Sequence, residues 1–211
     1  HHGVFDFTYL IPIPNLIILA PKDGLELVSM MQWAILQTSS VAIRYPRGSV
    51  SDREGQSNSV IQGVGSELLF SSDSDLSQSS DVLLIGVGAM AWDAVDAADI
   101  LVKEGVRVDV VNLQFIKPLD VSFLSTYVTR ASHVVVVEDG MVLGGVGAYL
   151  LAELGQICSI STQCWHNVGI GDYFVDHATQ KECRNACGLS VENIVKTVRS
   201  CVQETVQATS T

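Results

Sequence analysis

Short apolar runs alternate with helical stretches along this chain, and this alternation limits its fold more than any other feature. Residues 82–87 and 134–137 are nearly continuous apolar runs, of the length typical of strands buried on both faces. Between them, residues 91–104 place Val95, Ala98 and Leu101 on one side of a helix and acidic side chains on the other. The sequence therefore predicts a three-layer α/β domain in which helices cover both faces of a mostly parallel sheet.

Further segments complete this predicted domain. Strands are expected at residues 107–112 and 133–138, with Ser122 capping a short helix between them. A glycine-rich turn at residues 144–147 opens a helix that runs to about residue 154. A last amphipathic helix starts at Ser190 and places Val191, Ile194 and Val198 on one face.

The first 48 residues predict a smaller unit of strand, helix and strand. Residues 15–20 form an apolar run, and Asp23 with Glu26 has the pattern of a capping box that starts a helix. Residues 41–43 read as a second strand. A Ser- and Asp-rich linker follows, with one short strand expected near residues 60–64. We therefore expect a partial domain at 1–48, a linker at 49–79, a second domain at 80–205 and a tail at 206–211.

Composition excludes several classes of protein. Hydrophobic residues make up 47% of the chain, so it forms a core, yet no apolar run is long enough to cross a bilayer. A formal net charge of −11 opposes binding to nucleic acid or to an anionic membrane. The five cysteines form no regular framework, which favours a reducing compartment. Cys183 and Cys187, with His177 nearby, are interpreted as one face of a half-buried helix, so no metal site is expected.

Two glycine motifs could indicate a nucleotide-binding or a phosphate-binding site. Gly86, Gly88 and Ala91 satisfy a dinucleotide fingerprint, but the acid downstream, Asp109, lies inside a strand rather than at its end. A nicotinamide-dependent enzyme therefore remains only an alternative hypothesis. The glycines at 144–147 follow acidic residues, which favours close packing of a helix on the sheet over anion binding.

Arginine and histidine near the start of the chain are stronger candidates for chemistry. Arg44 and Arg47 flank Pro46 just after a predicted buried strand, at the sheet edge where ligands bind in open α/β folds. Guanidinium groups grip phosphate in a bidentate manner. We assign Arg44 to a structural ion pair, whereas Arg47 is open to both an anion-binding and a structural role. His1 could transfer protons near neutral pH, or could be the remnant of a purification tag.

Several motifs, taken together, point to one family. Those in the first segment are His-His-Gly-Val-Phe-Asp (1–6), Ala-Pro-Lys-Asp (20–23) and Ile-Arg-Tyr-Pro-Arg-Gly (43–48). Those in the second are Lys-Pro-Leu-Asp (117–120), Gly-Gly-Val-Gly (144–147) and Gly-Asp-Tyr-Phe-Val-Asp-His (171–177). The chain resembles the C-terminal portion of the 1-deoxy-D-xylulose-5-phosphate synthase family, within the transketolase superfamily. The resemblance implies the last part of a pyrimidine-binding domain followed by a transketolase C-terminal domain, and it implies that His1 is native.

The resemblance also implies an activity. In this family thiamine diphosphate and Mg²⁺ serve the decarboxylative condensation of pyruvate with glyceraldehyde 3-phosphate, for isoprenoid and thiamine biosynthesis. By position, His1 matches the active-site histidine, and Arg47 matches the arginine that holds the acceptor's phosphate. The Mg²⁺–diphosphate motif and the activating glutamate belong to an N-terminal part that this sequence lacks. We therefore expect no cofactor or metal on these 211 residues, which alone should be inactive.

Partners and alternatives follow from the same resemblance. The expected partners are the two substrates, the missing cofactor domain and a second copy in a homodimer, with no nucleic acid or membrane. One alternative is another enzyme of the superfamily, a transketolase or a 2-oxoacid dehydrogenase β subunit. Another is a non-catalytic assembly domain. A bacterial cytoplasm is the expected location, with a plastid as the alternative.

Overall fold

Two sheets organise the structure, a computed structural model that describes residues 3–48, 61–73, 76–158 and 165–208. The larger has the strand order β3-β5-β4-β7-β8, and only β3 is antiparallel to its neighbour. Its strands are β3 (Glu67–Ser71), β4 (Ser80–Val87), β5 (Val108–Asn112), β7 (Ala131–Met141) and β8 (Trp165–Ile170). The smaller has the order β2-β1-β6, with β1 (Ile17–Leu19), β2 (Val41–Ile43) and β6 (Phe115–Lys117).

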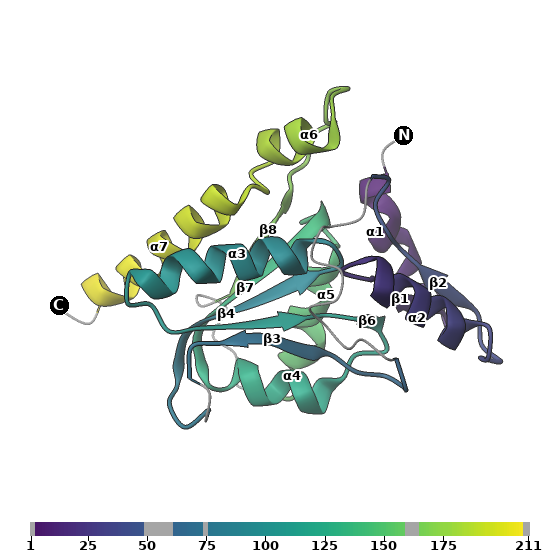
Figure 1. Ribbon diagram of the computed structural model, residues 1–211, viewed down its shortest axis with the longest axis horizontal. Helices are drawn as coiled ribbons and strands as arrows, with labels where there is room; N and C mark the ends of the chain where they lie inside the picture. The colour runs from purple at the N-terminus through teal and green to yellow at the C-terminus, as the bar shows by residue number, and fades with distance from the viewer. Residues whose placement is uncertain (1–2, 49–60, 74–75, 159–164, 209–211) are drawn as a thin grey trace.

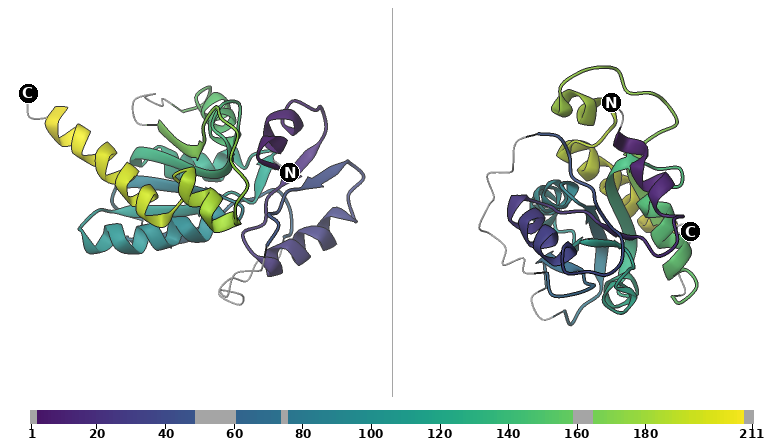
Figure 2. Two further views of the ribbon diagram at one scale, coloured as in Figure 1. Left: turned by 90° about the horizontal axis from the view of Figure 1, so that it is seen from above. Right: turned by 90° about the vertical axis from the view of Figure 1, so that its right-hand side faces the viewer.

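Helices cover both faces of the larger sheet, as Figures 1 and 2 show. One face packs against α3 (Met90–Lys103) and α7 (Val191–Ala208). The other packs against α4 (Val121–Val128), α5 (Val146–Leu154) and α1 (Asp6–Leu10), which follows the short helix η1 (Gly3–Phe5). The remaining helices are α2 (Gly24–Ala34) beside the smaller sheet and α6 (Gln180–Ala186). The predicted three-layer α/β class is thus confirmed.

The central strands β4 and β7 explain the layering. Their side chains alternate between two apolar clusters, so that Leu84 and Val135 face α3 and α7 while Ile85 and Val136 face α4 and α5. All four side chains have no exposed surface. Burial on both faces is why these strands read as continuous apolar runs rather than as alternating patterns.

The first segment is joined to the rest of the chain by strand pairing. β1 pairs in parallel with β2 and antiparallel with β6, which comes from the later part of the chain. Lys117, from the Lys-Pro-Leu-Asp motif, donates hydrogen bonds of 2.7 Å to the carbonyl oxygens of Ile11 and Ile13. Phe7 and Ile18 are buried in the same apolar cluster as strands of the larger sheet. The strand–helix–strand unit therefore shares a core with the second part of the chain.

Some sequence predictions need correction. The strand expected near residues 60–64 is not found at the described residues 61–64. The strand of this segment lies at Glu67–Ser71, where it pairs antiparallel with β5. The cap of α4 is Asp120, whose Oδ1 accepts a hydrogen bond of 3.0 Å from the Phe123 amide, and not Ser122. Asp23 does cap α2. The carboxylate of Glu26, however, accepts from the Lys22 amide, so the capping box is incomplete.

The turn after β4 shows why its glycines are needed. A Cβ on Gly86 would lie 2.3 Å from the Cα of Ala91, so the turn permits close packing of α3 on its own strand. Gly88 has a positive φ of 57° and lies against Ala20 and Pro21 of the first segment. Asp109 is buried and accepts a 2.6 Å hydrogen bond from Ser71. The first segment covers this turn, so the dinucleotide hypothesis finds no open phosphate site there.

Among the helices that the structure describes, none combines the length and the apolar character that crossing a membrane requires.

Candidate functional site

Arg44 connects three segments at the edge where β2 and β7 end. Its Nε lies 3.1 Å from Asp6 Oδ2, and its NH2 donates a 2.5 Å hydrogen bond to the carbonyl oxygen of Asp139. The guanidinium carbon also lies 5.2 Å from the centre of the Phe7 ring. Arg44 is therefore the structural ion pair that the sequence predicted. It holds α1, the end of β2 and the end of β7 together.

Arg47 lies three residues beyond Arg44 on the same surface segment. It is exposed, and no described residue forms an ion pair with it. A Cβ on the neighbouring Gly48 would lie 2.9 Å from the side-chain oxygen of Gln180, so this segment approaches the start of α6. An exposed guanidinium without a described acidic partner is available to bind an anion.

His1 lies outside the described residues, which begin at Gly3, but residues 4–6 are held at the same edge. Asp6 is bound by Arg44, and the backbone of Val4 lies near Gly140. The Phe5 ring meets Phe174 edge-on, with 6.2 Å between the ring centres. Phe174 belongs to the Gly-Asp-Tyr-Phe-Val-Asp-His motif. The first described residues thus contact both Arg44, three residues before Arg47, and this motif.

Arg184 of α6 extends this edge. Its NH2 lies 3.1 Å from Asp139 Oδ2, and its NH1 lies 3.7 Å from Asp93 Oδ2. Asp139 therefore meets one arginine through its backbone and another through its side chain. These contacts connect α3, β7 and α6 at the carboxyl end of the sheet.

Glu138 occupies the start of helix α5. Its carboxylate accepts hydrogen bonds of 2.8 and 2.9 Å from the amides of Val146 and Gly147. A Cβ on Gly145 would lie 1.9 Å from the carbonyl oxygen of Met141, so close packing requires glycine here. Burial raises the pKa of Glu138 to about 7, against the lowering effect of those amides and of Arg44. The predicted packing role of the glycines is confirmed, and the chain's own carboxyl group takes the anion position.

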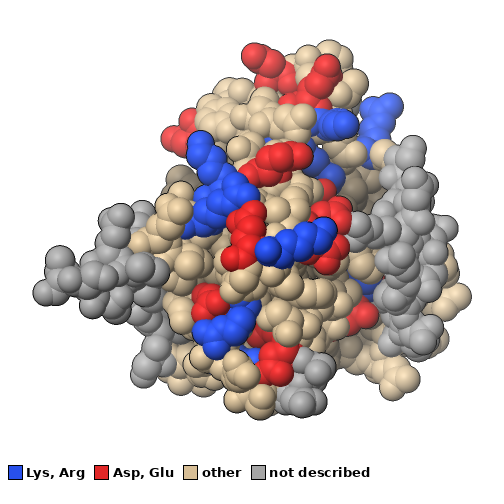
Figure 3. All heavy atoms as spheres, turned by 60° about the vertical axis from the view of Figure 1, so that its left-hand side comes forward, with Lys and Arg blue, Asp and Glu red and all other residues tan. Residues whose placement is uncertain are grey.

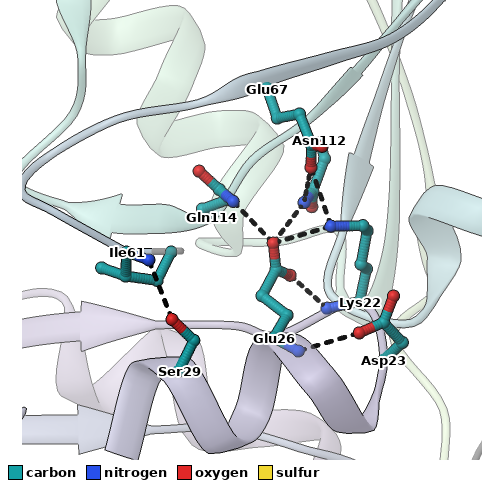
Figure 4. Close-up of polar contacts among 8 residues, drawn as sticks. All are labelled: Lys22, Asp23, Glu26, Ser29, Ile61, Glu67, Asn112 and Gln114. Carbon is teal, nitrogen blue, oxygen red and sulfur yellow. Dashed lines mark hydrogen bonds and ion pairs between the residues drawn. The ribbon is translucent and has the colours of Figure 1, made fainter. Parts of the chain in front are cut away.

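A buried polar network lies between the first segment and the larger sheet (Figure 4). Lys22 Nζ is 2.9 Å from Glu26 Oε1 and 2.7 Å from Glu67 Oε2. The side-chain amides of Asn112 and Gln114 donate to Glu26 at 2.9 and 2.6 Å. Burial opposes a charge on Lys22, but the neighbouring Glu26 and Glu67 raise its pKa overall. Lys22 is therefore held as a cation between two carboxylates.

On the face that Figure 3 shows, side chains of both charges lie close together. In Figure 3, Lys and Arg side chains alternate with Asp and Glu on the face that is shown, without a continuous basic area. Exposed pairs such as Arg107 with Asp81 add to this mixing. The expectation that nucleic acid is not a partner is untested.

The described residues include one group of potential metal ligands, and its chemistry does not suit Mg²⁺. The one group of three or more potential metal ligands among them consists of two imidazoles and a thiol. Mg²⁺ prefers carboxylate, carbonyl and water oxygens in an octahedral arrangement.

Comparison with known proteins identifies the family. Residues 75–194 match the model described as "Transketolase, C-terminal domain". The chain belongs to the transketolase C-terminal domain family. A solved structure described as "Split gene transketolase, inactive beta4 tetramer" has a TM-score of 0.80 and 22% identity, covering 95% of this chain and 61% of that one. This second match shows the fold alone.

Three curated relatives of this transketolase-family chain carry the same name. The 1-deoxy-D-xylulose-5-phosphate synthase of Desulforudis audaxviator is 34% identical over 95% of the chain, and that of Aquifex aeolicus is 35% identical over 96%. The Gloeobacter violaceus protein of the same name is 38% identical over 94%. The chain spans only 30–31% of the length of these relatives. The resemblance to the C-terminal portion of this synthase family is confirmed.

The sequence analysis did not predict the buried polar network around Lys22. Lys22 and Glu26 have the i,i+4 spacing of a helical ion pair, but Glu67 comes 45 residues after Lys22, within the predicted linker, and nothing in the sequence indicates that it joins them. Lys22 in an Ala-Pro-Lys-Asp motif was the available signal, because a lysine directly after an apolar strand needs a partner if it is buried.

Proposed function

We propose that this chain is the C-terminal part of a 1-deoxy-D-xylulose-5-phosphate synthase, which condenses pyruvate with glyceraldehyde 3-phosphate and releases CO₂. The similarity to synthases over at least 94% of the chain supports this assignment. The observation that carries it is the position of Arg47, an exposed cation with no acidic partner among the described residues, at the carboxyl edge of the strands. A phosphorylated acceptor needs such a cation in a protein of net charge −11.

In this proposal Arg44 has a structural role and Arg47 binds the substrate. Arg44 is committed to Asp6 and to the carbonyl of Asp139, so its donors are used within the protein. It fixes the segment that leads to Arg47. Arg47 presents its guanidinium fork to the phosphate group of the acceptor.

His1 is proposed as the group that hydrogen-bonds to the reacting oxygens or exchanges protons with them. His1 itself lies outside the described residues. The segment that follows it is anchored through Asp6 to Arg44, on the same surface as Arg47. Imidazole titrates near neutral pH, which suits proton transfer.

The cofactor is proposed to be held by another part of the enzyme. Thiamine diphosphate, bound with Mg²⁺, supplies the carbanion chemistry of this enzyme class. Among the described residues, the one group of three potential His, Cys, Asp or Glu ligands is His133, His166 and Cys201, which does not suit that metal. The proposed partners are therefore the cofactor-binding part and a second copy of the chain, in a cytoplasmic or plastid setting.

The outer face of α2 is apolar and exposed, which supports the proposal that another part of the protein covers it. Leu25, Val28, Met31 and Ile35 follow helical spacing and are 44%, 54%, 47% and 81% exposed. We propose that the cofactor-binding part covers this face, because the chain spans about 30% of its relatives' length.

Product analysis tests the proposed function. The full-length protein, supplied with pyruvate, glyceraldehyde 3-phosphate, thiamine diphosphate and Mg²⁺, should form deoxyxylulose phosphate. The 211-residue chain alone should form none and should retain no thiamine diphosphate in equilibrium dialysis. A ketose phosphate from a ketose donor would identify a transketolase, and acyl transfer to a lipoyl group a dehydrogenase subunit. Turnover by the isolated chain would contradict the proposed division of the active site.

A further inference from the structure

Two histidines and a cysteine meet at the opposite end of the sheet from the candidate site. His133 lies near the start of β7, His166 near the start of β8, and Cys201 on α7. One potential ligand atom from each lies within 4.8 Å of those of the other two. Glu138 and Asp139 come five and six residues after His133 on β7, which is roughly 16 to 20 Å along a strand. This cluster is therefore separate from the edge that bears Arg47.

Strand register explains why the imidazoles meet. His166 pairs with Val135, two residues after His133, so both imidazoles project from the same face as Val135. Val135 packs in the cluster that includes Val198 of α7. Cys201 follows Val198 by three residues and lies on the same buried side of that helix. The two rings are 5.9 Å apart between centres.

The surroundings suit a coordinated ion. His133 and Cys201 are 5% and 3% exposed, and the Nε2 atom of His166 is buried without a hydrogen-bond partner. His166 and Cys201 also line a hollow beside α7, which gives room for entry and for a fourth ligand. Lys196 lines the same hollow but is an exposed residue, so its ammonium can stay in solvent.

We propose that His133, His166 and Cys201 form a zinc site that clamps α7 to strands β7 and β8. Imidazole and thiolate are the ligands that zinc prefers, at about 2.0–2.1 and 2.3 Å. In tetrahedral coordination the ligand atoms lie roughly 3.4–3.6 Å from one another. In the structure these atoms are at most 4.8 Å apart, so the distances between them need to shorten by about 1 Å. Water takes the fourth position, and the thiol releases its proton when zinc binds.

The site has a structural role rather than a catalytic one in this proposal. It joins elements that begin 26 residues apart, β8 at residue 165 and α7 at residue 191, and it lies far from the substrate-binding edge. It was not expected from the sequence, because its ligands come from three elements and have no metal-binding spacing.

Zinc titration of the purified 211-residue chain, under reducing conditions and with a competing chelator, tests the proposal. One zinc per chain should bind, and Cys201→Ser and His166→Asn should each weaken binding at least about tenfold. The matched controls are Cys183→Ser and His177→Asn, which lie outside the cluster and should leave affinity unchanged. Cobalt(II) in place of zinc should give a thiolate charge-transfer band that Cys201→Ser abolishes.

Thermal unfolding makes the outcome interpretable if a variant folds poorly. Zinc should raise the midpoint of the parent chain and of both controls, but not that of Cys201→Ser or His166→Asn. Each variant is also melted without metal, so that loss of folding is distinguished from loss of a ligand. No zinc binding at micromolar concentration, or binding that both cluster variants retain, would overturn the proposal. Neither result would affect the role of Arg47.

Discussion

At the residue scale, Glu138 illustrates how position changes the chemistry of a side chain. The acid is fully buried beneath the first turn of α5, where two backbone amides point at it. A helix N-terminus favours negative charge, yet the cost of burial is larger and raises the pKa to about 7. The sequence showed acids next to glycines, from which packing rather than ligand binding could be predicted. The pKa could not, because it depends on burial by distant elements.

This pKa predicts a pH-dependent contribution to stability. Below about pH 4.5 Glu138 is protonated in both the folded and the unfolded chain. As the pH rises to about 7 the unfolded chain ionises first, so the free energy of unfolding falls by up to about 3 kcal/mol and then stays level. Urea unfolding of the parent chain and of Glu138→Gln, from pH 4.5 to 8, measures this term. The free energy of unfolding of the parent minus that of Glu138→Gln should fall by that amount as the pH rises. A constant or rising value of this difference contradicts the assignment.

At the scale of elements, long strands and amphipathic helices could be predicted and short pairing strands could not. β4 and β7 can be predicted from their apolar runs, and α3 can be predicted from the helical spacing of its apolar residues. β6 has only three residues and is a strand because β1, about 100 residues earlier, pairs with it. Such elements depend on contacts from distant sequence, which local patterns do not contain. The division at residues 48 and 79 stays a prediction.

Helix α4 provides a test of the corrected cap. Asp120→Ala should lower the free energy of unfolding by about 1 kcal/mol, because the Phe123 amide loses its acceptor. Ser122→Ala is the matched control, since Ser122 is exposed and does not cap the helix, and it should change stability little. The outcome is read from urea midpoints. If the two substitutions lower the stability equally, the assignment of Asp120 as the cap is contradicted.

The buried lysine between the two sheets provides a second test at this scale. Lys22→Met leaves Glu26 and part of Glu67 buried without their cation, so it should destabilise the chain by about 3–5 kcal/mol. Arg199→Met, which removes one partner of an exposed pair with Glu104, is the control and should have little effect. Equilibrium unfolding in urea gives both values. If the two variants unfold at the same midpoint, the network does not hold the first segment in place.

At the scale of the whole molecule, the first segment and the later part of the chain share one apolar core. The first segment contributes β1, β2 and the arginines, and the second contributes the larger sheet on which they rest. The chain matches about 30% of its synthase relatives. The fold class and the family could be predicted because their motifs are spread over both parts, whereas the contacts of the candidate site required the structure. The roles of His1 and Arg47 remain proposals.

The kinetics of Arg47→Ala in the full-length protein test the central proposal most directly. Loss of a charge-assisted phosphate contact should raise the KM for glyceraldehyde 3-phosphate by roughly 10- to 100-fold, with the KM for pyruvate unchanged. Arg107→Ala, an exposed arginine paired with Asp81 on a different part of the surface, is the matched control and should leave both values unchanged. Arg47→Lys should restore only part of the loss, because an ammonium lacks the planar fork. A KM for glyceraldehyde 3-phosphate that Arg47→Ala leaves within twofold of the parent value would contradict the proposed role.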